Sequence, residues 1–129
     1  MKIYETKGFA RWRQKQAILD DVLCTAVSEI ERGLTDGNLG GNLYKTRVPA
    51  PGKGKRGSYR TLLAFKSKTS AFFVFGFSKN ARGNITGKEE RALKALAKEL
   101  LGYGAKEIRK AIKANEILEV RCENEPENE

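Results

Sequence analysis

A chain of 129 residues is long enough for one domain with a single core and too short for two. Its shares of 40% hydrophobic and 32% charged residues are typical of a soluble globular protein. No apolar run is long enough for a membrane span or a signal peptide, so we expect a cytoplasmic protein without a membrane partner. The net charge of +9 favours a polyanionic partner, of which nucleic acid is the commonest.

The first elements predicted are a strand and a short helix. Residues 2–6 alternate weakly between apolar and polar side chains and suit a short strand. Residues 8–16 follow a helical pattern that turns Phe9 and Trp12 inward. The cations of this helix should then point outward into water: Arg11, Arg13 and Lys15.

A longer amphipathic helix follows and ends at Gly33, a residue type that suits the position after a helix C-terminus. Its apolar side chains recur at helical spacing and should form one buried face: Leu19, Val22, Leu23, Ala26, Val27 and Ile30. Residues 35–42 consist almost entirely of turn-forming Gly, Asn and Asp, so we expect a loop there.

Three strands are predicted in the middle of the chain. Residues 42–48 alternate, residues 58–67 are rich in strand-forming side chains, and residues 70–80 form a nearly continuous aromatic and apolar run. The last two are separated by a hairpin-length turn, so they should pair antiparallel. The first two are joined by a basic segment rich in Pro and Gly, residues 49–57.

Two further helices are predicted near the C-terminus. Residues 88–101 and 105–114 both have apolar side chains at helical spacing, and residues 117–120 suit a strand or a docking segment. The acidic residues 122–129 predict a disordered tail, which leaves residues 1–121 as a single domain with a mixed α/β (α+β) fold.

The sequence contains no histidine and only two cysteines, Cys24 and Cys122, far apart in the chain. Neither zinc-site spacing nor a cofactor motif is present, so we expect no metal and no cofactor. We interpret Cys24 as a buried helical residue and Cys122 as a stray thiol near the tail, with a disulfide between them as the alternative. Without histidine, proton transfer has to come from Lys, Arg, Tyr, a carboxylate or the substrate itself.

The basic charge is concentrated in one part of the chain. From Gly37 to Lys88 there are eleven Lys and Arg and no Asp or Glu, whereas the remaining segments hold fourteen cations and sixteen acids. Such a segment attracts polyanions; a solvated basic face without a specific partner is the alternative. Residues 47–60 lack the GK[ST] end of a phosphate-binding P-loop and precede a strand, so we interpret them as a hairpin connection. Three cations of this connection should contact the backbone of a bound nucleic acid such as RNA: Lys53, Lys55 and Arg56.

Alternation within the strands can place several cations on one sheet face. Lys45 and Arg47 are two residues apart in the first of the three strands, Arg60 lies in the second, and Lys79 belongs to the third. Their mutual repulsion would be costly unless an anion lies between them. The alternative is that they lie on separate faces and extend into water.

A cluster of this kind can cleave RNA without histidine or a metal ion. The 2′-hydroxyl attacks the adjacent phosphorus, fixed cations stabilise the charge of the pentavalent transition state, and the cut leaves a 2′,3′-cyclic phosphate. Neighbouring cations favour the neutral form of a lysine, which suits Lys45 to act as general base while another cation protonates the leaving oxygen.

The ordered set "YKTRV", "GSYRTLLAF" and "FFVFGFSKNARGNI", followed by a Leu- and Lys-rich helix, resembles toxins of the RelE/ParE superfamily. The basic connection "GKGKRG" is similar to that of the HigB-like branch. The similarity is strongest over residues 40–101, and the segment "EIRKAIKANEILEV" resembles the C-terminal extension of a RelE-annotated subfamily. The resemblance implies a RelE-like fold: N-terminal helices packed on a small, twisted, mainly antiparallel sheet, with additional C-terminal helices.

The resemblance also implies a function and a site. A type II toxin of this kind is a ribosome-dependent mRNA endoribonuclease that inhibits translation, and its partners are mRNA, the ribosome and a cognate antitoxin, which we expect to be a small helix-turn-helix protein. The position of the family's catalytic arginine is Asn80 here, and that of its late tyrosine is Thr86, which leaves the assignment of acid and base open. Arg82 or Lys79 would replace the acid, and Tyr59 or Phe77 would stack on a base. The basic positions of the family fall on Lys45, Arg47, Arg60 and Lys79.

Two other functions remain as alternatives. The ParE branch of the same superfamily poisons DNA gyrase without cutting RNA. A passive nucleic-acid-binding module would bind RNA in a salt-sensitive manner and leave growth unaffected.

Overall fold

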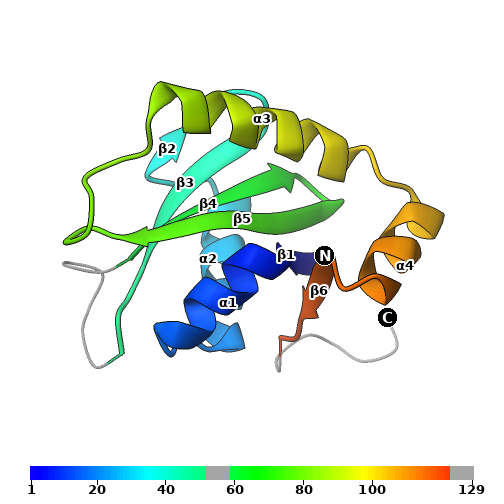
Figure 1. Ribbon diagram of the computed structural model, residues 1–129, viewed down its shortest axis with the longest axis horizontal. Coiled ribbons are helices and arrows are strands. Elements are labelled where there is room, and N and C mark those ends of the chain that lie inside the picture. Colours follow the sequence, from blue (N-terminus) through cyan, green and yellow to red (C-terminus); the bar gives the residue numbers. More distant parts are fainter. Residues whose placement is uncertain (52–58, 123–129) are drawn as a thin grey trace.

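The computed structural model describes residues 1–51 and 59–122 (Figure 1). No helix in these residues is long and apolar enough to cross a membrane. In chain order the elements are β1 (Lys2–Thr6), α1 (Lys7–Lys15), α2 (Asp20–Glu31), β2 (Gly37–Asn38), β3 (Leu43–Val48), β4 (Tyr59–Lys66), β5 (Ser70–Ser78), α3 (Gly87–Leu101), α4 (Ala105–Lys113) and β6 (Ile117–Val120).

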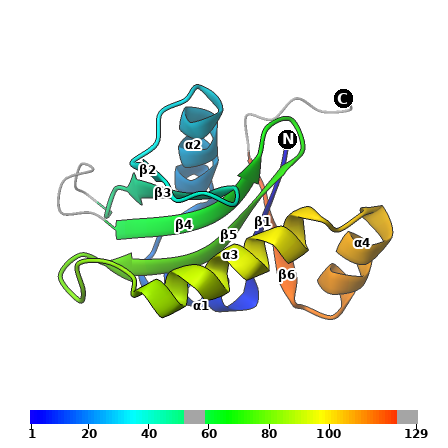
Figure 2. The same ribbon diagram turned by 90° about the horizontal axis from the view of Figure 1, so that it is seen from above.

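The strands form one six-stranded sheet in the order β2-β3-β4-β5-β1-β6. Neighbouring strands are antiparallel except β1 and β5, which run parallel. Helices α1 and α2 lie against one face of the sheet, below it in Figure 1, and α3 crosses the other face, in front of the sheet in Figure 2. The predicted fold, helices on a small and mainly antiparallel sheet with further C-terminal helices, is confirmed.

Each sheet face carries its own core, because side chains alternate along the strands. Leu63 and Phe73 face the α1 and α2 side, where they pack with Phe9, Leu23 and Val27. On the other face the buried residues are Leu43, Leu62, Phe72 and Phe77 of the sheet together with Leu93, Ala97 and Leu100 of α3. The apolar faces predicted for these helices are therefore largely confirmed.

Strand β5 approaches α1 so closely that one position has no room for a side chain. A Cβ atom on Gly76 would lie 2.2 Å from Cζ3 of Trp12. The indole also packs against Phe9 and makes an edge contact with Tyr59, with ring centroids 5.6 Å apart in both pairs. Gly76 thus lets the Trp12 ring lie directly on the sheet.

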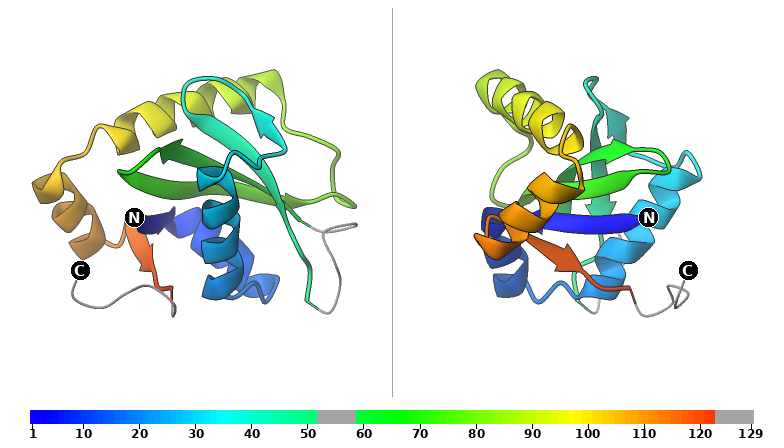
Figure 3. Two further views of the ribbon diagram at one scale, coloured as in Figure 1. Left: turned by 180° about the vertical axis from the view of Figure 1, so that it is seen from behind. Right: turned by 90° about the vertical axis from the view of Figure 1, so that its right-hand side faces the viewer.

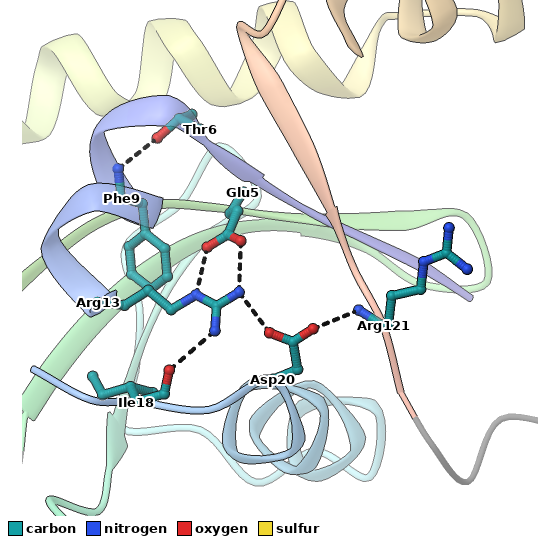
Figure 4. A network of polar contacts seen from close by, with 7 residues as sticks. All are labelled: Glu5, Thr6, Phe9, Arg13, Ile18, Asp20 and Arg121. Atoms are coloured by element: carbon teal, nitrogen blue, oxygen red, sulfur yellow. Dashed lines mark hydrogen bonds and ion pairs between the residues drawn. The ribbon is translucent and has the colours of Figure 1, made fainter. Parts of the chain in front are cut away.

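The prediction that Arg13 points into water is wrong, because the side chain is only 8% exposed. Its Nε and Nη2 donate hydrogen bonds to the buried carboxylate of Glu5 in β1, at 2.8 and 2.7 Å (Figure 4). Nη1 donates to the carbonyl oxygen of Ile18 at 3.0 Å, and Nη2 forms an ion pair with Asp20 at 2.6 Å. A carboxylate buried on β1 needs a compensating cation, and the end of α1 supplies it.

Two further expectations need correction. Leu19 does not belong to the buried face of α2: it is the residue before the helix, with extended backbone angles, and it is 69% exposed. The loop predicted at residues 35–42 contains the short strand β2, which pairs with β3 through Gly37 and Lys45. Gly33 takes the positive φ of 84° expected after a helix end.

The two cysteines form a disulfide, so the interpretation of Cys122 as a stray thiol is wrong and the alternative is confirmed. Cys24 lies in helix α2 as predicted, but it is only half-buried. Strand β6 pairs antiparallel with β1, and this pairing carries the chain past the start of α2 (Figure 3). The Cα atoms of Cys24 and Cys122 are 5.8 Å apart. The acidic residues 123–129 lie outside the described residues, so their predicted disorder stays a prediction.

Candidate active site

The cross-strand register brings the predicted cations of β3 and β4 together. Arg47 lies directly opposite Arg60, and Arg60 lies directly opposite Phe77 of β5. Directly opposite residues in an antiparallel pair project from the same face with their Cβ atoms about 4.5–5.5 Å apart. Lys45, two residues before Arg47, projects from that face as well. It is the face that α3 covers, since Phe77 packs with Leu93 and Ala97.

Arg60 has an unused hydrogen-bond donor inside this cluster. The side chain is half-buried, and its Nη1 atom is shielded from solvent without a hydrogen-bond partner among the residues that the structure describes. A buried charged donor left unpaired costs more free energy than an ordinary missing hydrogen bond. Arg60 is therefore suited to bind an anion at this position.

Arg47 is already held by a carboxylate. Its Nε and Nη2 atoms both lie 3.1 Å from Oδ1 of Asp36, and its backbone N–H donates to Oδ2 of the same residue at 2.8 Å. Both side chains are partly exposed, at 41% and 29%. Asp36 therefore orients the guanidinium of Arg47 while leaving part of it accessible. The segment without acidic residues begins at Gly37, one residue after Asp36, so the charge distribution along the chain gave no sign of this ion pair. The turn-forming residues before β3 did indicate that the chain could fold back and bring Asp36 to that strand.

The two predicted lysines differ in their surroundings, and Lys79 lies outside the strand in which it was predicted. Lys45 is half-buried and its chain passes over Gly37 of β2, where a Cβ would lie 3.6 Å from Lys45 Cε. Lys79 is exposed in the turn after β5, and the backbone N–H of its neighbour Asn80 donates to Ser78 Oγ at 3.2 Å. Lys45 is thus fixed by packing, whereas Lys79 has access to solvent at the end of the same sheet.

Arg82 is engaged in a structural ion pair. Its Nη1 donates to Oε2 of Glu89 at 3.0 Å, its Nη2 pairs with Oε1 of the same carboxylate, and its Nε donates to the carbonyl oxygen of Asn84. The ion pair raises the pKa of Arg82 and, chiefly through the hydrogen bonds from Arg82, lowers the pKa of Glu89 to about 2. An arginine held in its charged form in this way is poorly suited to act as a general acid.

Glu89 also caps helix α3. Thr86 accepts from the backbone N–H of Glu89 at 3.1 Å, and the Glu89 carboxylate accepts from the backbone N–H of Thr86 at 2.8 Å. This capping box pairs two backbone N–H groups at the start of the helix, and the ion pair with Arg82 connects the helix start to the segment after β5. The pattern "TGKE" matches the signature of a capping box and could have predicted this cap, but it gives no sign of the ion pair with Arg82.

Neither of the two predicted stacking residues, Tyr59 and Phe77, presents an exposed ring beside Arg60. Phe77 is 4% exposed, and the guanidinium of Arg82 lies over its ring at 5.6 Å. Tyr59 alternates with Arg60, so its ring lies on the opposite face of the sheet, against Trp12. Neither ring is therefore available to a base beside Arg60. Three predicted RNA contacts lie outside the described residues: Lys53, Lys55 and Arg56.

The comparisons with known proteins agree with this architecture. The chain matches the family model described as RelE toxin of RelE / RelB toxin-antitoxin system over residues 1–120. No curated protein is similar enough to count as a match. Because the family match covers nearly the entire chain, the protein belongs to the RelE family of toxins from toxin–antitoxin systems.

Proposed function

We propose that this toxin is a ribosome-dependent endoribonuclease that cleaves mRNA in the cytoplasm and inhibits translation. Family membership gives the chain an antitoxin as partner, and we propose a small helix-turn-helix protein in that role. The observation that carries the catalytic proposal is the pair of directly opposed cations, Arg47 and Arg60, in which Arg60 retains an unpaired and shielded Nη1 donor.

The proposed reaction needs a phosphodiester between these cations. The 2′-oxygen bonds to the adjacent phosphorus, the bond to the 5′-oxygen breaks, and the products carry a 2′,3′-cyclic phosphate and a 5′-hydroxyl. Arg60 Nη1 and the Arg47 guanidinium hydrogen-bond the non-bridging oxygens, whose charge increases in the transition state. Fixed donors lower the barrier because they need no reorganisation when that charge develops.

Two lysines are proposed to move the protons. Lys45, in its neutral form, takes the proton of the 2′-hydroxyl, and Lys79, in its charged form, gives a proton to the leaving 5′-oxygen. Lys79 replaces the family arginine at Asn80, and the engagement of Arg82 with Glu89 favours Lys79 over Arg82 for this role. The step uses no metal ion.

The test is cleavage of mRNA on programmed ribosomes by Arg60→Ala, with Arg109→Ala as the matched control, an exposed arginine of α4. We expect Arg60→Ala to lower the single-turnover cleavage rate by about 10²–10³-fold with an unchanged melting temperature, as for removal of one transition-state donor. Arg109→Ala should cleave at the wild-type rate. Wild-type cleavage by Arg60→Ala would contradict the assignment of the site.

Further measurements, in vitro and on induction in cells, separate the proposed function from its alternatives. A 2′-deoxy nucleotide at the cleaved position should block cleavage, and the 5′ fragment should end in a cyclic phosphate. DNA damage on induction without new mRNA 5′ ends would instead indicate a gyrase poison. Salt-sensitive RNA binding without growth arrest would indicate a passive binding module.

A further inference from the structure

Strand β6 lies at the edge of the sheet. Among the strands that the structure describes it pairs with β1 alone, from Ile3 and Val120 to Thr6 and Ile117, and Glu119 adds an ion pair with Lys2 at 3.1 Å. Two of its four side chains, Ile117 and Val120, are buried. Edge strands of this length are the parts of a sheet that open most easily.

Two contacts fasten the end of β6 to α2. The backbone N–H of Arg121 donates to Oδ2 of Asp20 at 3.0 Å (Figure 4). The next residue, Cys122, is bonded to Cys24. Asp20 and Cys24 are four residues apart, so they lie on the same side of α2. Arg121 and Cys122, the two residues after β6, therefore lie along one side of this helix. The disulfide is the covalent part of their attachment to α2.

The disulfide can be reached from solvent. Both cysteines are half-buried, and both line an open cleft of about 380 Å³ beside Met1 and Thr25. A cleft of this volume admits a small thiol, and thiol–disulfide exchange needs access of a thiolate to one sulfur of the bond.

We propose that Cys24–Cys122 is a thiol–disulfide exchange site for small thiols, and that its oxidation state controls how firmly β6 is held against α2. A thiolate bonds to one cysteine sulfur, the S–S bond breaks, and the other cysteine leaves as a thiolate that takes up a proton. A second small thiolate then bonds to the small-thiol sulfur of the mixed disulfide, the S–S bond breaks, and the second cysteine leaves as a thiolate that also takes up a proton. Both cysteines end reduced, and two small thiols end oxidised to one disulfide. The Cys24–Cys122 bond forms again by the reverse reaction, with a small disulfide as the oxidant.

In the reduced protein, β6 keeps its ladder with β1 and Arg121 keeps its contact with Asp20, but the covalent attachment to α2 is lost. The effect of reduction should therefore be confined to the edge of the sheet. Strand β4 lies three positions from β6 in the sheet order, beyond β5 and β1, and serves as an internal reference. This inference does not depend on the proposed endoribonuclease activity.

The experiment is amide hydrogen exchange of the full chain in glutathione buffers of graded redox ratio, read by mass spectrometry. We expect a peptide linking Cys24 to Cys122 in oxidising buffer, lost in reducing buffer at native pH without denaturant. Exchange of β6 amides should rise by at least about tenfold on reduction, with β4 amides unchanged. The Cys24→Ser/Cys122→Ser variant should behave like the reduced protein in every buffer.

Three results would overturn the proposal. The first is that no linked peptide forms in oxidising buffer. The second is that the bond in the folded protein resists reduction at every glutathione ratio. The third is that β6 amides exchange at the same rate in both forms, or that β4 amides accelerate equally, which would indicate global unfolding instead of local release.

Discussion

The buried carboxylate of Glu5 should be among the most sensitive positions for stability. Glu5 is 2% exposed and Arg13 is 8% exposed, and two of the Arg13 hydrogen bonds end on the Glu5 carboxylate. Glu5→Gln keeps the size of the side chain but removes the negative charge. Removal of one partner from a buried ion pair costs about 3–5 kcal/mol, and we expect about 3 kcal/mol because Asp20 still pairs with Arg13.

This free energy converts to a shift in melting temperature. An unfolding entropy of about 2.1 cal/mol/K per residue gives roughly 270 cal/mol/K for the chain, so a loss of about 3 kcal/mol lowers the melting temperature by about 11 °C. The control is Glu119→Gln, which removes the exposed ion pair with Lys2 at 3.1 Å and should cost about 0.5 kcal/mol, or about 2 °C. Both are measured by circular dichroism on the oxidised protein. Equal shifts for the two variants would refute the assignment of a stabilising role to the buried pair.

Two further predictions concern the packing of β5 and the cap of α3. Gly76→Ala should lower the free energy of unfolding by about 1–3 kcal/mol in a denaturant titration, because its Cβ would overlap Trp12. The control is Gly83→Ala, which should be neutral because no atom lies within 4 Å of the new Cβ. Equal unfolding midpoints for the two variants would contradict the close packing of Gly76 on Trp12. The Glu89 carboxylate should titrate near pH 2 by NMR and move toward 4.5 in Arg82→Ala. Because the pKa of Glu89 is lowered in the folded state, its stabilising contribution is present above pH 4.5 and is lost as the pH falls toward 2. If Arg82→Ala left the titration of Glu89 unchanged, the ion pair with Arg82 would not be the cause of the lowered pKa.

Local patterns predicted the part of the candidate site that depends on neighbouring strands. The period of two in β3 and β4 indicated that Arg47 and Arg60 could share a face, and the structure places them directly opposite each other. Alternation alone also placed Arg60 and Tyr59 on different faces. The family resemblance suggested Tyr59 as a stacking residue in spite of that pattern.

Contacts between distant segments could not be predicted in this way. Arg13 lies four residues after Phe9, so helical spacing puts it on the buried face of α1, but only the position of Glu5 on the neighbouring strand explains how a cation is accommodated there. The disulfide depends on the pairing of β6 with β1, which brings Cys122 to Cys24 from the other end of the chain. A count of charges along the sequence shows only which charged residues are close in the chain, whereas ion pairs form between residues that the fold brings together.

The sheet order has a consequence for how the protein folds during synthesis. Strands β3 and β4, which carry the candidate cations, are followed directly by β5 along the chain, so the pairing of these three strands closes only short loops. Strand β1 is made first, but its neighbour β6 is made last, and pairing across nearly the whole chain is slow. We therefore expect the β3–β5 meander to be folded on a nascent chain before β1 acquires its second neighbour. A toxin truncated before β6 would then carry its basic strands on an unfinished sheet.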